Sequence, residues 1–443
     1  MSSSAARPRR ARVLLALVLA LGAACSPSRP TNVLLISIDT LRADRLGCYG
    51  YARPTSPTLD ALARGGTLFE HTVAQSPWTV PSHATLFTGL FPHGHGVVSE
   101  SDRLAEELPT LATLLRGRGF LTAAVVQTSW LSAAQGFTQG FDSFVEIPDY
   151  ADGGTLVARA AETWLRAYAG RPLFLFLHFY DVHSEYRPKP EYRERFTKPY
   201  DGFVDGSTMQ LQELRNGFLA LGARDLEQLS DLYDAEIRQL DDALGRLLPL
   251  LDELGVRDET LVVVTADHGE EFLEHGNVLH GRTLYREVLA VPLIWNGPGV
   301  PRGARVAAIA SLADVVPTVL GRLGAAVPAG LDGIDLLAAP GPSAERRVVA
   351  AADHYNAEPD SLRMIQDLRY KLIVERITGA VHLYDLERDP AERTDVAAQS
   401  PERVATLRQQ LERHLARARQ APARAPLSPE QAERLRALGY LVP

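Results

Sequence analysis

Two apolar runs that each lead into an aspartate constrain the fold of this chain more than any other feature. The first covers residues 32–38 and precedes Asp39, and the second covers 260–265 and leads to Asp267. Such runs, without polar alternation, are typical of strands buried on both faces, as in parallel sheets covered by helices. Similar runs occur at 121–127 and 173–179. The sequence therefore predicts an α/β fold.

Helical patterns separate these strands, and Ser-Pro or Gly marks some of their ends. The predicted helices cover 56–65, 155–169, 224–251 and 314–323. After about residue 340 the pattern changes to short, half-polar strands joined by turns, which predict a small antiparallel unit. These strands are expected at 362–366, 370–374 and 381–385. A charged amphipathic helix is expected over 401–418, and a docked tail over 427–443.

The first 24 residues have the composition of a secretory signal segment. Four arginines precede an apolar run over 13–21, and small residues come directly before Cys25. The run is shorter than the ~20 apolar residues of a membrane-spanning helix. We therefore expect an exported protein, periplasmic or at the cell surface. Cys25 resembles the modified cysteine of a bacterial lipoprotein, so lipid anchoring and plain secretion both stay open.

Charge and cysteine content limit the partners and the compartment. The net charge is −8, and without the four signal arginines it is −12, which argues against nucleic acid as the main partner. Cys25 and Cys48 are the only cysteines, so loss or lipidation of Cys25 excludes an internal disulfide. We expect a catalytic domain over 30–340 and a small C-terminal antiparallel subdomain with a helical tail over 345–443. No feature of the sequence predicts an oligomeric state.

The stretch 75–89 is expected to hold a nucleophile. Prolines at two positions prevent a helix or a central strand from beginning there. Ser82 is a good N-cap, and Gly89 can end a helix. A short helix is therefore predicted to start just after Thr79. A hydroxyl at a helix N-terminus lies where backbone N–H groups and the helix dipole favour an anion, which suits attack on a phosphate or sulfate ester.

Asp39, Asp267 and His268 are expected to form a metal site, because open α/β sheets bind ligands beyond the carboxyl ends of their strands. With the Thr79 hydroxyl as a fourth ligand they could hold a divalent metal. An imidazole among the ligands favours Mn²⁺ or Zn²⁺, and Ca²⁺ stays possible. The alternative for Asp39 is a capping or turn carboxylate. The alternative for Asp267 and His268 is a surface turn.

Several segments of the chain resemble the sulfatase family of the alkaline-phosphatase superfamily. They are 32–50, 81–82, 233–237, 267–270, 285–292 and 383–390, in family order over nearly all of the chain after the signal. The resemblance implies an alkaline-phosphatase-like α/β/α sandwich with a central mixed, mainly parallel sheet and a small C-terminal antiparallel sheet. It also implies an exported, metal-dependent hydrolase of small-molecule or glycan esters of sulfate, phosphate or phosphonate.

The chain departs from the family pattern at the expected active site. Thr79 stands where the family has the Cys or Ser that is converted to formylglycine, and His83 stands where it has Arg. Thr40 replaces a second metal aspartate, while Gln127 and Ser129 lie near the positions of a sulfate-binding Lys and His. Other branches of the superfamily use an unmodified threonine on a metal. The resemblance therefore assigns Thr79 as the nucleophile and the three strand-end residues as metal ligands.

The expected reaction is in-line attack of the Thr79 hydroxyl, activated by the metal, on phosphorus or sulfur. Water then cleaves the covalent ester on Thr79. His183 resembles the family histidine that contacts the leaving group, and either His183 or His280 could be the general acid. His83 and Arg282 could bind the free oxygens of the anion.

Alternatives to this interpretation stay open. Asp181 with His183 and His280 could form a second metal site. The chain could also be a catalytically silent sulfatase-fold protein that binds a glycan or an envelope component. A phosphoethanolamine-type transferase would usually carry a membrane domain and several disulfides, which the sequence lacks. His93 and His95 are interpreted as loop residues rather than metal ligands.

Overall fold

The computed structural model describes residues 29–99, 102–147, 153–339, 341–343, 345–353, 361–419, 429 and 433. The predicted signal segment 1–24 and Cys25 lie outside these residues, as does nearly all of the predicted tail over 427–443. Within the described part, no helix combines the length and apolar character needed to cross a bilayer. Cys48 is a free thiol.

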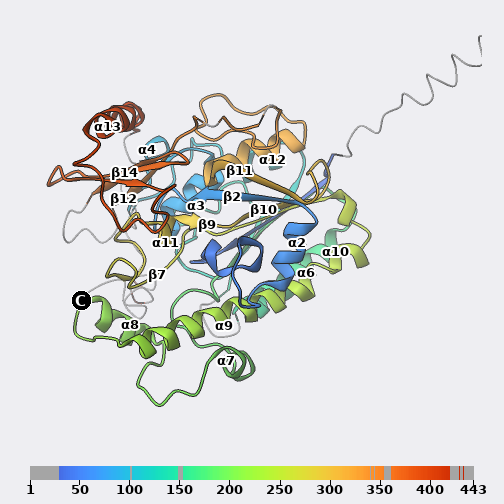
Figure 1. Ribbon diagram of the computed structural model, residues 1–443. Helices are drawn as coiled ribbons and strands as arrows, with labels where there is room; N and C mark the ends of the chain where they lie inside the picture. Colours follow the sequence, from blue (N-terminus) through green and yellow to red (C-terminus); the bar gives the residue numbers. More distant parts are fainter. Residues whose placement is uncertain are drawn as a thin grey trace, which may run out of the picture.

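A nine-stranded sheet forms the centre of the molecule (Figure 1). Its strands follow the order β11-β2-β10-β6-β1-β5-β3-β4, and β9 pairs with β2. Their bounds are β1 (Asn32–Ile38), β2 (Thr67–Val73), β3 (Leu121–Val126), β4 (Ser143–Glu146), β5 (Leu173–Phe179), β6 (Thr260–Thr265), β9 (Ala290–Val291), β10 (Leu293–Asn296) and β11 (Ala304–Ser311). Only the pairings of β9 and β10 are antiparallel. The prediction of a mixed, mainly parallel sheet is confirmed.

Helices cover both faces of this sheet. On one face, α9 contacts both α2 and α6, and on the other α3 contacts both α5 and α12; Figure 1 shows α9 and α12 on opposite sides of the strands. The longer helices are α2 (Pro57–Arg64), α3 (Thr79–Thr88), α5 (Leu111–Arg116), α6 (Gly153–Tyr168), α7 (Pro190–Phe196), α8 (Thr208–Arg215), α9 (Ala223–Leu247) and α12 (Val315–Arg322). The short elements are α4 (Pro92–His95), α10 (Leu250–Glu253), α11 (Arg286–Leu289), β7 (Glu271–Phe272) and β8 (Val278–Leu279).

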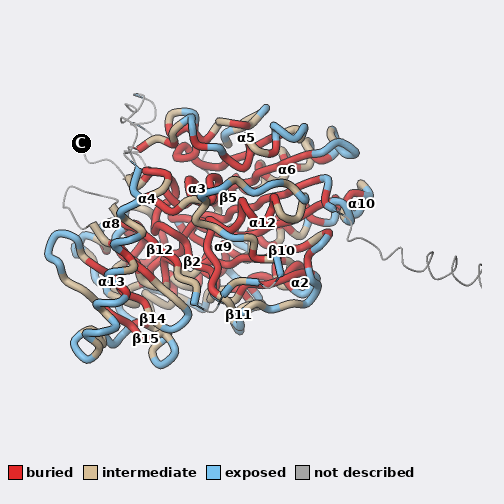
Figure 2. The backbone as a smooth tube through the Cα atoms, turned by 90° about the horizontal axis from the view of Figure 1, so that it is seen from above, coloured by how far each residue is buried: buried red, intermediate tan, exposed pale blue. Residues whose placement is uncertain are grey.

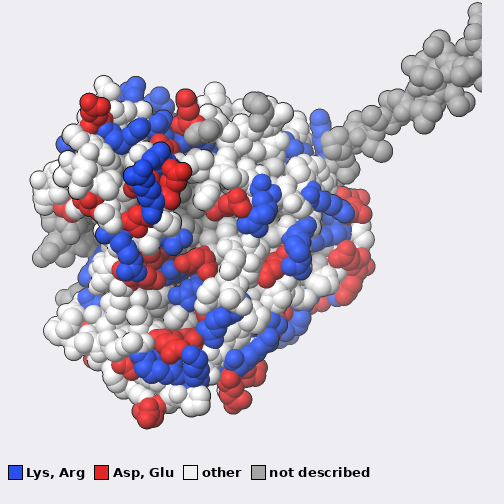
Figure 3. All heavy atoms as spheres, in the orientation of Figure 1, with Lys and Arg blue, Asp and Glu red and all other residues white. Residues whose placement is uncertain are grey.

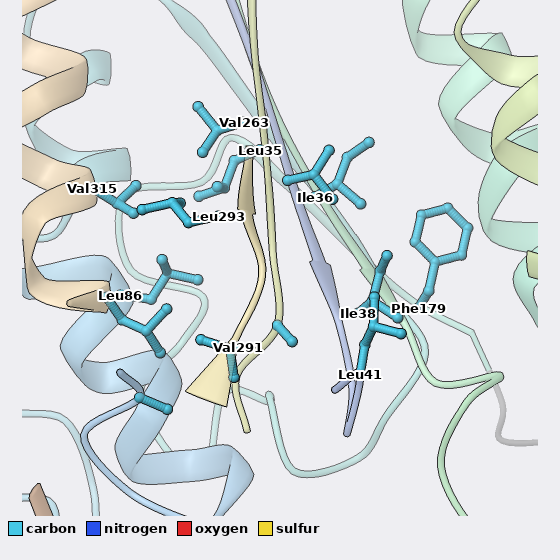
Figure 4. Packing of buried hydrophobic residues seen from close by; sticks show 14 of the residues in the cluster. Leu35, Ile36, Ile38, Leu41, Leu86, Phe179, Val263, Val291, Leu293 and Val315 are labelled. Atoms are coloured by element: carbon cyan, nitrogen blue, oxygen red, sulfur yellow. The ribbon is translucent and has the colours of Figure 1, made fainter. Parts of the chain in front are cut away.

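Side chains of the central strands fill the core on both sides of the sheet. Every residue of β1, β5 and β6 is buried, and in Figure 2 the buried chain is concentrated in the middle of the molecule. Figure 4 shows Leu35 and Leu293 on the side of Leu86 and Val315, whereas Ile36 points to the other side. Successive residues of a strand point to opposite faces. A sheet covered on both faces therefore needs the unalternating apolar runs of this sequence.

The C-terminal part forms a separate four-stranded antiparallel sheet, as the sequence predicts. Its strands are β12 (Val348–Ala352), β13 (Leu362–Gln366), β14 (Tyr370–Glu375) and β15 (Val381–Asp385), and helix α13 (Pro401–Leu415) packs on β13 and β14. On the face shown in Figure 3, Lys and Arg lie among Asp and Glu rather than in one basic stripe.

The structure corrects several predicted elements. The pattern over 224–251 is two helices, because α9 ends at Leu247 and Pro249 begins the separate turn of α10. The sequence does not predict β4, β11 or β12. The last two are rich in alanine, which is depleted in strands, and they form because β2 and β13 pair with them.

Candidate active site

Three polar side chains meet beyond the carboxyl ends of β1 and β6. These strands are adjacent and parallel, so the residues that follow them come to the same edge of the sheet. Asp39, Asp267 and His268 are all fully buried. One potential ligand atom of each lies within 4.8 Å of the other two.

His268 presents its Nε2 atom to this cluster. Its Nδ1 lies 3.0 Å from the Gly269 carbonyl oxygen, which can only accept, so Nδ1 carries a proton. Nε2 lies 3.6 Å from Asp39 Oδ1 and 3.5 Å from Asp267 Oδ2. The Thr79 Oγ1 atom is 3.4 Å from the same nitrogen. The structure thus brings together all four residues expected to bind metal.

The electrostatics of the cluster fit a divalent cation. Burial alone would lower the pKa of His268, but the carboxylates of Asp267 and Asp39 outweigh burial and raise that pKa. Oδ2 of Asp267 is buried and accepts no hydrogen bond from any described residue. Two buried carboxylates beside one imidazole leave negative charge that is costly in a low-dielectric interior. A cation bound by these oxygen and nitrogen atoms would neutralise that charge.

Thr79 is the first residue of α3. The N-cap is Trp78, whose side chain makes no capping hydrogen bond, so the first N–H groups of the helix can face an anion. The predicted helix start near Thr79 and its end at Gly89, with φ of 71°, are confirmed. The prediction that Ser82 caps the helix is wrong. Ser82 lies inside α3, where its hydroxyl donates to a backbone carbonyl of the preceding loop at 2.8 Å.

His83 lies one turn along α3 from Thr79 and is fully buried. Its Nδ1 donates to the Thr79 carbonyl oxygen at 2.9 Å, and its Nε2 accepts from the Ser37 hydroxyl at 3.0 Å. Burial lowers the pKa of His83 to about 3, so the ring is neutral. Nδ1 therefore holds the first turn of α3, and Nε2 connects the helix to β1, so His83 supports Thr79 from within the protein.

His183 and His280 lie side by side, with ring centres 4.9 Å apart, and the His280 ring is 4.4 Å from that of His268. The His280 Nδ1 atom donates to Glu270 Oε1 at 2.9 Å. The His183 Nδ1 atom donates to a backbone carbonyl at 2.8 Å, and its Nε2 accepts from the Tyr180 hydroxyl at 3.2 Å. Burial and the nearby His280 lower the pKa of His183 to about 3.

The remaining candidates have different surroundings. Arg282 is exposed, two residues beyond His280. Among the described residues, groups able to bind a metal converge in three trios, and Asp181 belongs to none of them. Thr40, with φ of 55°, donates its backbone N–H to Asp267 Oδ1 at 3.3 Å. Its hydroxyl donates to the Val182 carbonyl, so Thr40 orients Asp267.

The sequence interpretation takes His178 for an ordinary core group or a group behind the site, and it includes Glu270 only as part of the family motif. His178 lies in β5, and its Nε2 is 3.3 Å from Asp39 Oδ2; burial lowers the pKa of His178 to about 4. Its position beside Asp39 follows from the pairing of β5 with β1, which the sequence does not state. Glu270 directly follows Asp267–Gly269, and this position next to the predicted metal ligands could have indicated a role in the site.

Replacement of Gly269 by Ala is expected to destabilise the protein by roughly 2 kcal/mol or more. A Cβ atom at this position would lie 2.0 Å from the Glu287 carbonyl oxygen, and the Gly269 N–H bond to Val288 fixes the backbone there. The free energy of unfolding in urea measures the effect. Gly222→Ala is the matched control, since Gly222 is exposed and the added Cβ makes only an ordinary contact. Equal stabilities of the two variants would contradict the prediction.

Glu271→Gln is expected to remove part of the pH dependence of stability. Burial raises the pKa of Glu271 to about 8, so the folded protein holds a neutral carboxyl group. The neutral carboxyl of Glu271 contributes its full stabilisation below about pH 4.5. As pH rises from there toward 8, the free energy of unfolding falls by up to about 1.4 kcal/mol per pH unit. Urea unfolding at pH 5 and pH 8 tests this. The exposed Glu402→Gln should behave as wild type, and parallel pH profiles for all three proteins would refute the idea.

Comparisons with known proteins identify the family to which this fold belongs. Residues 31–325 match the family model described as Sulfatase. Arylsulfatase A of Homo sapiens is 28% identical in an alignment of 473 positions, gaps included, that covers 89% of each chain. The phosphonate monoester hydrolase of Agrobacterium radiobacter has a similar solved structure, with a TM-score of 0.74 and 25% identity over 88% of this chain and 96% of that chain. A structure in complex with its substrate D-glucosamine-2-N,6-O-disulfate has a TM-score of 0.75 and 22% identity, covering 88% and 98%.

Proposed function

The chain belongs to the sulfatase family of sulfuric and phosphoric ester hydrolases, and on that premise we propose that it hydrolyses phosphate or phosphonate esters, and sulfate esters less well, with Thr79 as nucleophile. One observation carries the proposal. Oγ1 of Thr79 lies 3.4 Å from Nε2 of His268, which forms a group of potential metal ligands with Asp39 and Asp267. An unmodified threonine at this position favours phosphorus chemistry, as in other branches of the superfamily.

Each residue of the site has a distinct part in the proposal. A divalent metal held by Asp39, Asp267 and His268 would lower the pKa of the adjacent hydroxyl and neutralise developing charge. Thr79 Oγ1 attacks phosphorus or sulfur, the alcohol leaves with a proton, and an ester on Thr79 forms. Water then hydrolyses that ester and restores the hydroxyl. The N–H groups at the start of α3 face the anionic oxygens.

We assign the role of proton donor to the leaving oxygen to His280, because Glu270 fixes its ring orientation. His280→Gln is expected to lower kcat by about 10²–10³-fold for alkyl esters. The loss should be much smaller for nitrophenyl esters, whose leaving oxygen needs no proton. Paired kcat measurements on the two ester types check this. An equal loss for both would show that His280 acts elsewhere in the reaction.

A substrate panel tests the proposed activity. Purified protein would be assayed with Mn²⁺, Zn²⁺ or Ca²⁺ on an aryl sulfate, an aryl phosphate, a bis-aryl phosphate and an aryl phosphonate ester. We expect the highest kcat/KM on the phosphate or phosphonate esters with Mn²⁺ or Zn²⁺. Turnover of the sulfate ester alone would overturn the preference. Tight metal binding without turnover of any ester would favour the silent, glycan-binding alternative.

Substrate and location are further parts of the proposal. The similar structure in complex with D-glucosamine-2-N,6-O-disulfate leads us to include sulfated and phosphorylated glycans in the panel. The signal-like residues 1–24 lead us to propose export, with Cys25 as a lipid attachment site. In a bacterial expression host, labelled fatty acid should enter the wild type but not Cys25→Ser. Retention of the wild-type precursor in the cytoplasm would contradict export.

A further inference from the structure

A second cluster of potential metal ligands lies far from the active-site residues in the sequence. His93, Asp332 and His414 each offer one atom within 4.8 Å of the other two. His93 is buried, and the other two are partly buried. The ring centres of His93 and His414 are 6.1 Å apart. Two imidazoles and one carboxylate form a donor set typical of Zn²⁺.

The three side chains come from separate elements that the cluster joins. His93 lies in α4, Asp332 lies in the loop after α12, and His414 lies in the last turn of α13. Figure 1 shows α4 beside α13. The structure therefore corrects the interpretation of His93 as a loop residue.

The surroundings of the cluster orient its ligand atoms. Oδ2 of Asp332 accepts from the Phe91 N–H at 2.8 Å, which leaves the other carboxylate oxygen for a cation. Such outer hydrogen bonds commonly hold metal ligands in place. Nδ1 of His414 is buried and has no hydrogen-bond partner among the described residues. The Asp332 backbone N–H donates to the Gly89 carbonyl at 3.0 Å, so the loop itself is fixed.

We propose that His93, Asp332 and His414 bind a Zn²⁺ ion, with water as its fourth ligand, that attaches α13 to the catalytic domain. Ligand atoms on tetrahedral zinc are about 3.3 Å apart, so small side-chain rotations would close the site. His93 also lines a cavity, together with Pro92 and Glu412.

Three basic side chains near the cluster, Arg363, Arg413 and Arg417, do not prevent cation binding. Arg363 is paired with the Asp353 carboxylate at 2.6 and 2.7 Å, so its charge is balanced. Arg413 and Arg417 are exposed, and water and salt screen their charges. The Asp332 carboxylate, by contrast, lies within the cluster itself.

Zinc content after chelation, Zn²⁺ reloading and dialysis tests the proposal on the full-length protein. Wild type is expected to retain one more equivalent of Zn²⁺ per chain than each of the variants His93→Gln, Asp332→Asn and His414→Gln. His71→Gln is the matched control, because His71 is exposed and belongs to none of the three trios. Equal zinc content in wild type and the three ligand variants would overturn the proposal. Catalytic activity should stay unchanged in His414→Gln, which separates this site from the proposed reaction.

A second measurement does not depend on how well the variants fold. Amide hydrogen exchange over 401–415 would be compared in wild type with and without Zn²⁺. Exchange should slow by about 100-fold when free Zn²⁺ is 100 times its Kd, because release of α13 breaks the site. In His414→Gln, Zn²⁺ should not change the exchange rate, which would attribute the slower exchange in wild type to this site. Identical exchange in wild type with and without Zn²⁺ would refute an attachment role.

Discussion

Thr79→Ala is expected to lower kcat/KM on the preferred ester by about 10⁴-fold or more, because loss of a nucleophile removes the covalent pathway altogether. Thr79 is also only 1% exposed, so the expected loss refers to a hydroxyl inside the protein rather than one on its surface. Steady-state kinetics on the best substrate of the panel measures the effect. Thr79→Ser should retain far more activity, since it keeps the hydroxyl.

A matched variant on the same helix separates chemistry from packing. Thr88→Ala removes a hydroxyl near the other end of α3, where it donates to the Ala84 carbonyl. This variant should keep most of the wild-type activity. Metal content of Thr79→Ala should remain near that of wild type, because two carboxylates and an imidazole still bind the ion. Turnover by Thr79→Ala equal to wild type would remove this threonine from the mechanism.

Chelation is the second change with a large expected effect. Stripping the metal should lower activity by at least about 10³-fold, since both activation of the hydroxyl and charge neutralisation are lost. Mn²⁺ or Zn²⁺ should restore the wild type. Asp39→Asn should not recover, because an amide replaces one of the two carboxylates that make the site attractive to a cation.

The control for the metal experiment is Asp258→Asn, which alters an exposed carboxylate. This variant should lose and regain activity as the wild type does. Activity of the wild type that persists after chelation, with no metal detectable in the protein, would contradict a metal-dependent reaction. Full recovery of Asp39→Asn would show that Asp39 does not bind the ion.

Local patterns in the sequence determined the main sheet and its cover of helices. Apolar runs of strand length are buried on both faces because helices cover both faces of the sheet. The Ser-Pro and Gly signals correctly marked the two ends of α2. The same reasoning failed for β11 and β12, because pairing with a neighbouring strand, rather than intrinsic preference, makes these segments extended. It also placed the start of α3 near Thr79 while misidentifying Ser82 as its cap.

Strand ends indicated Asp39, Asp267 and His268, and the predicted helix start and the family resemblance indicated Thr79. The structure brings these four residues together. Only the tertiary structure could show that His178 borders Asp39 or that the ring of His83 bonds to the Thr79 carbonyl. The same holds for His93 and His414, which meet although more than 300 residues separate them in the sequence. Burial of an apolar pattern is a local property that the chain carries in its own order of residues. Contact between side chains from different elements depends on which strands and helices become neighbours, and the order of residues along the chain does not state that.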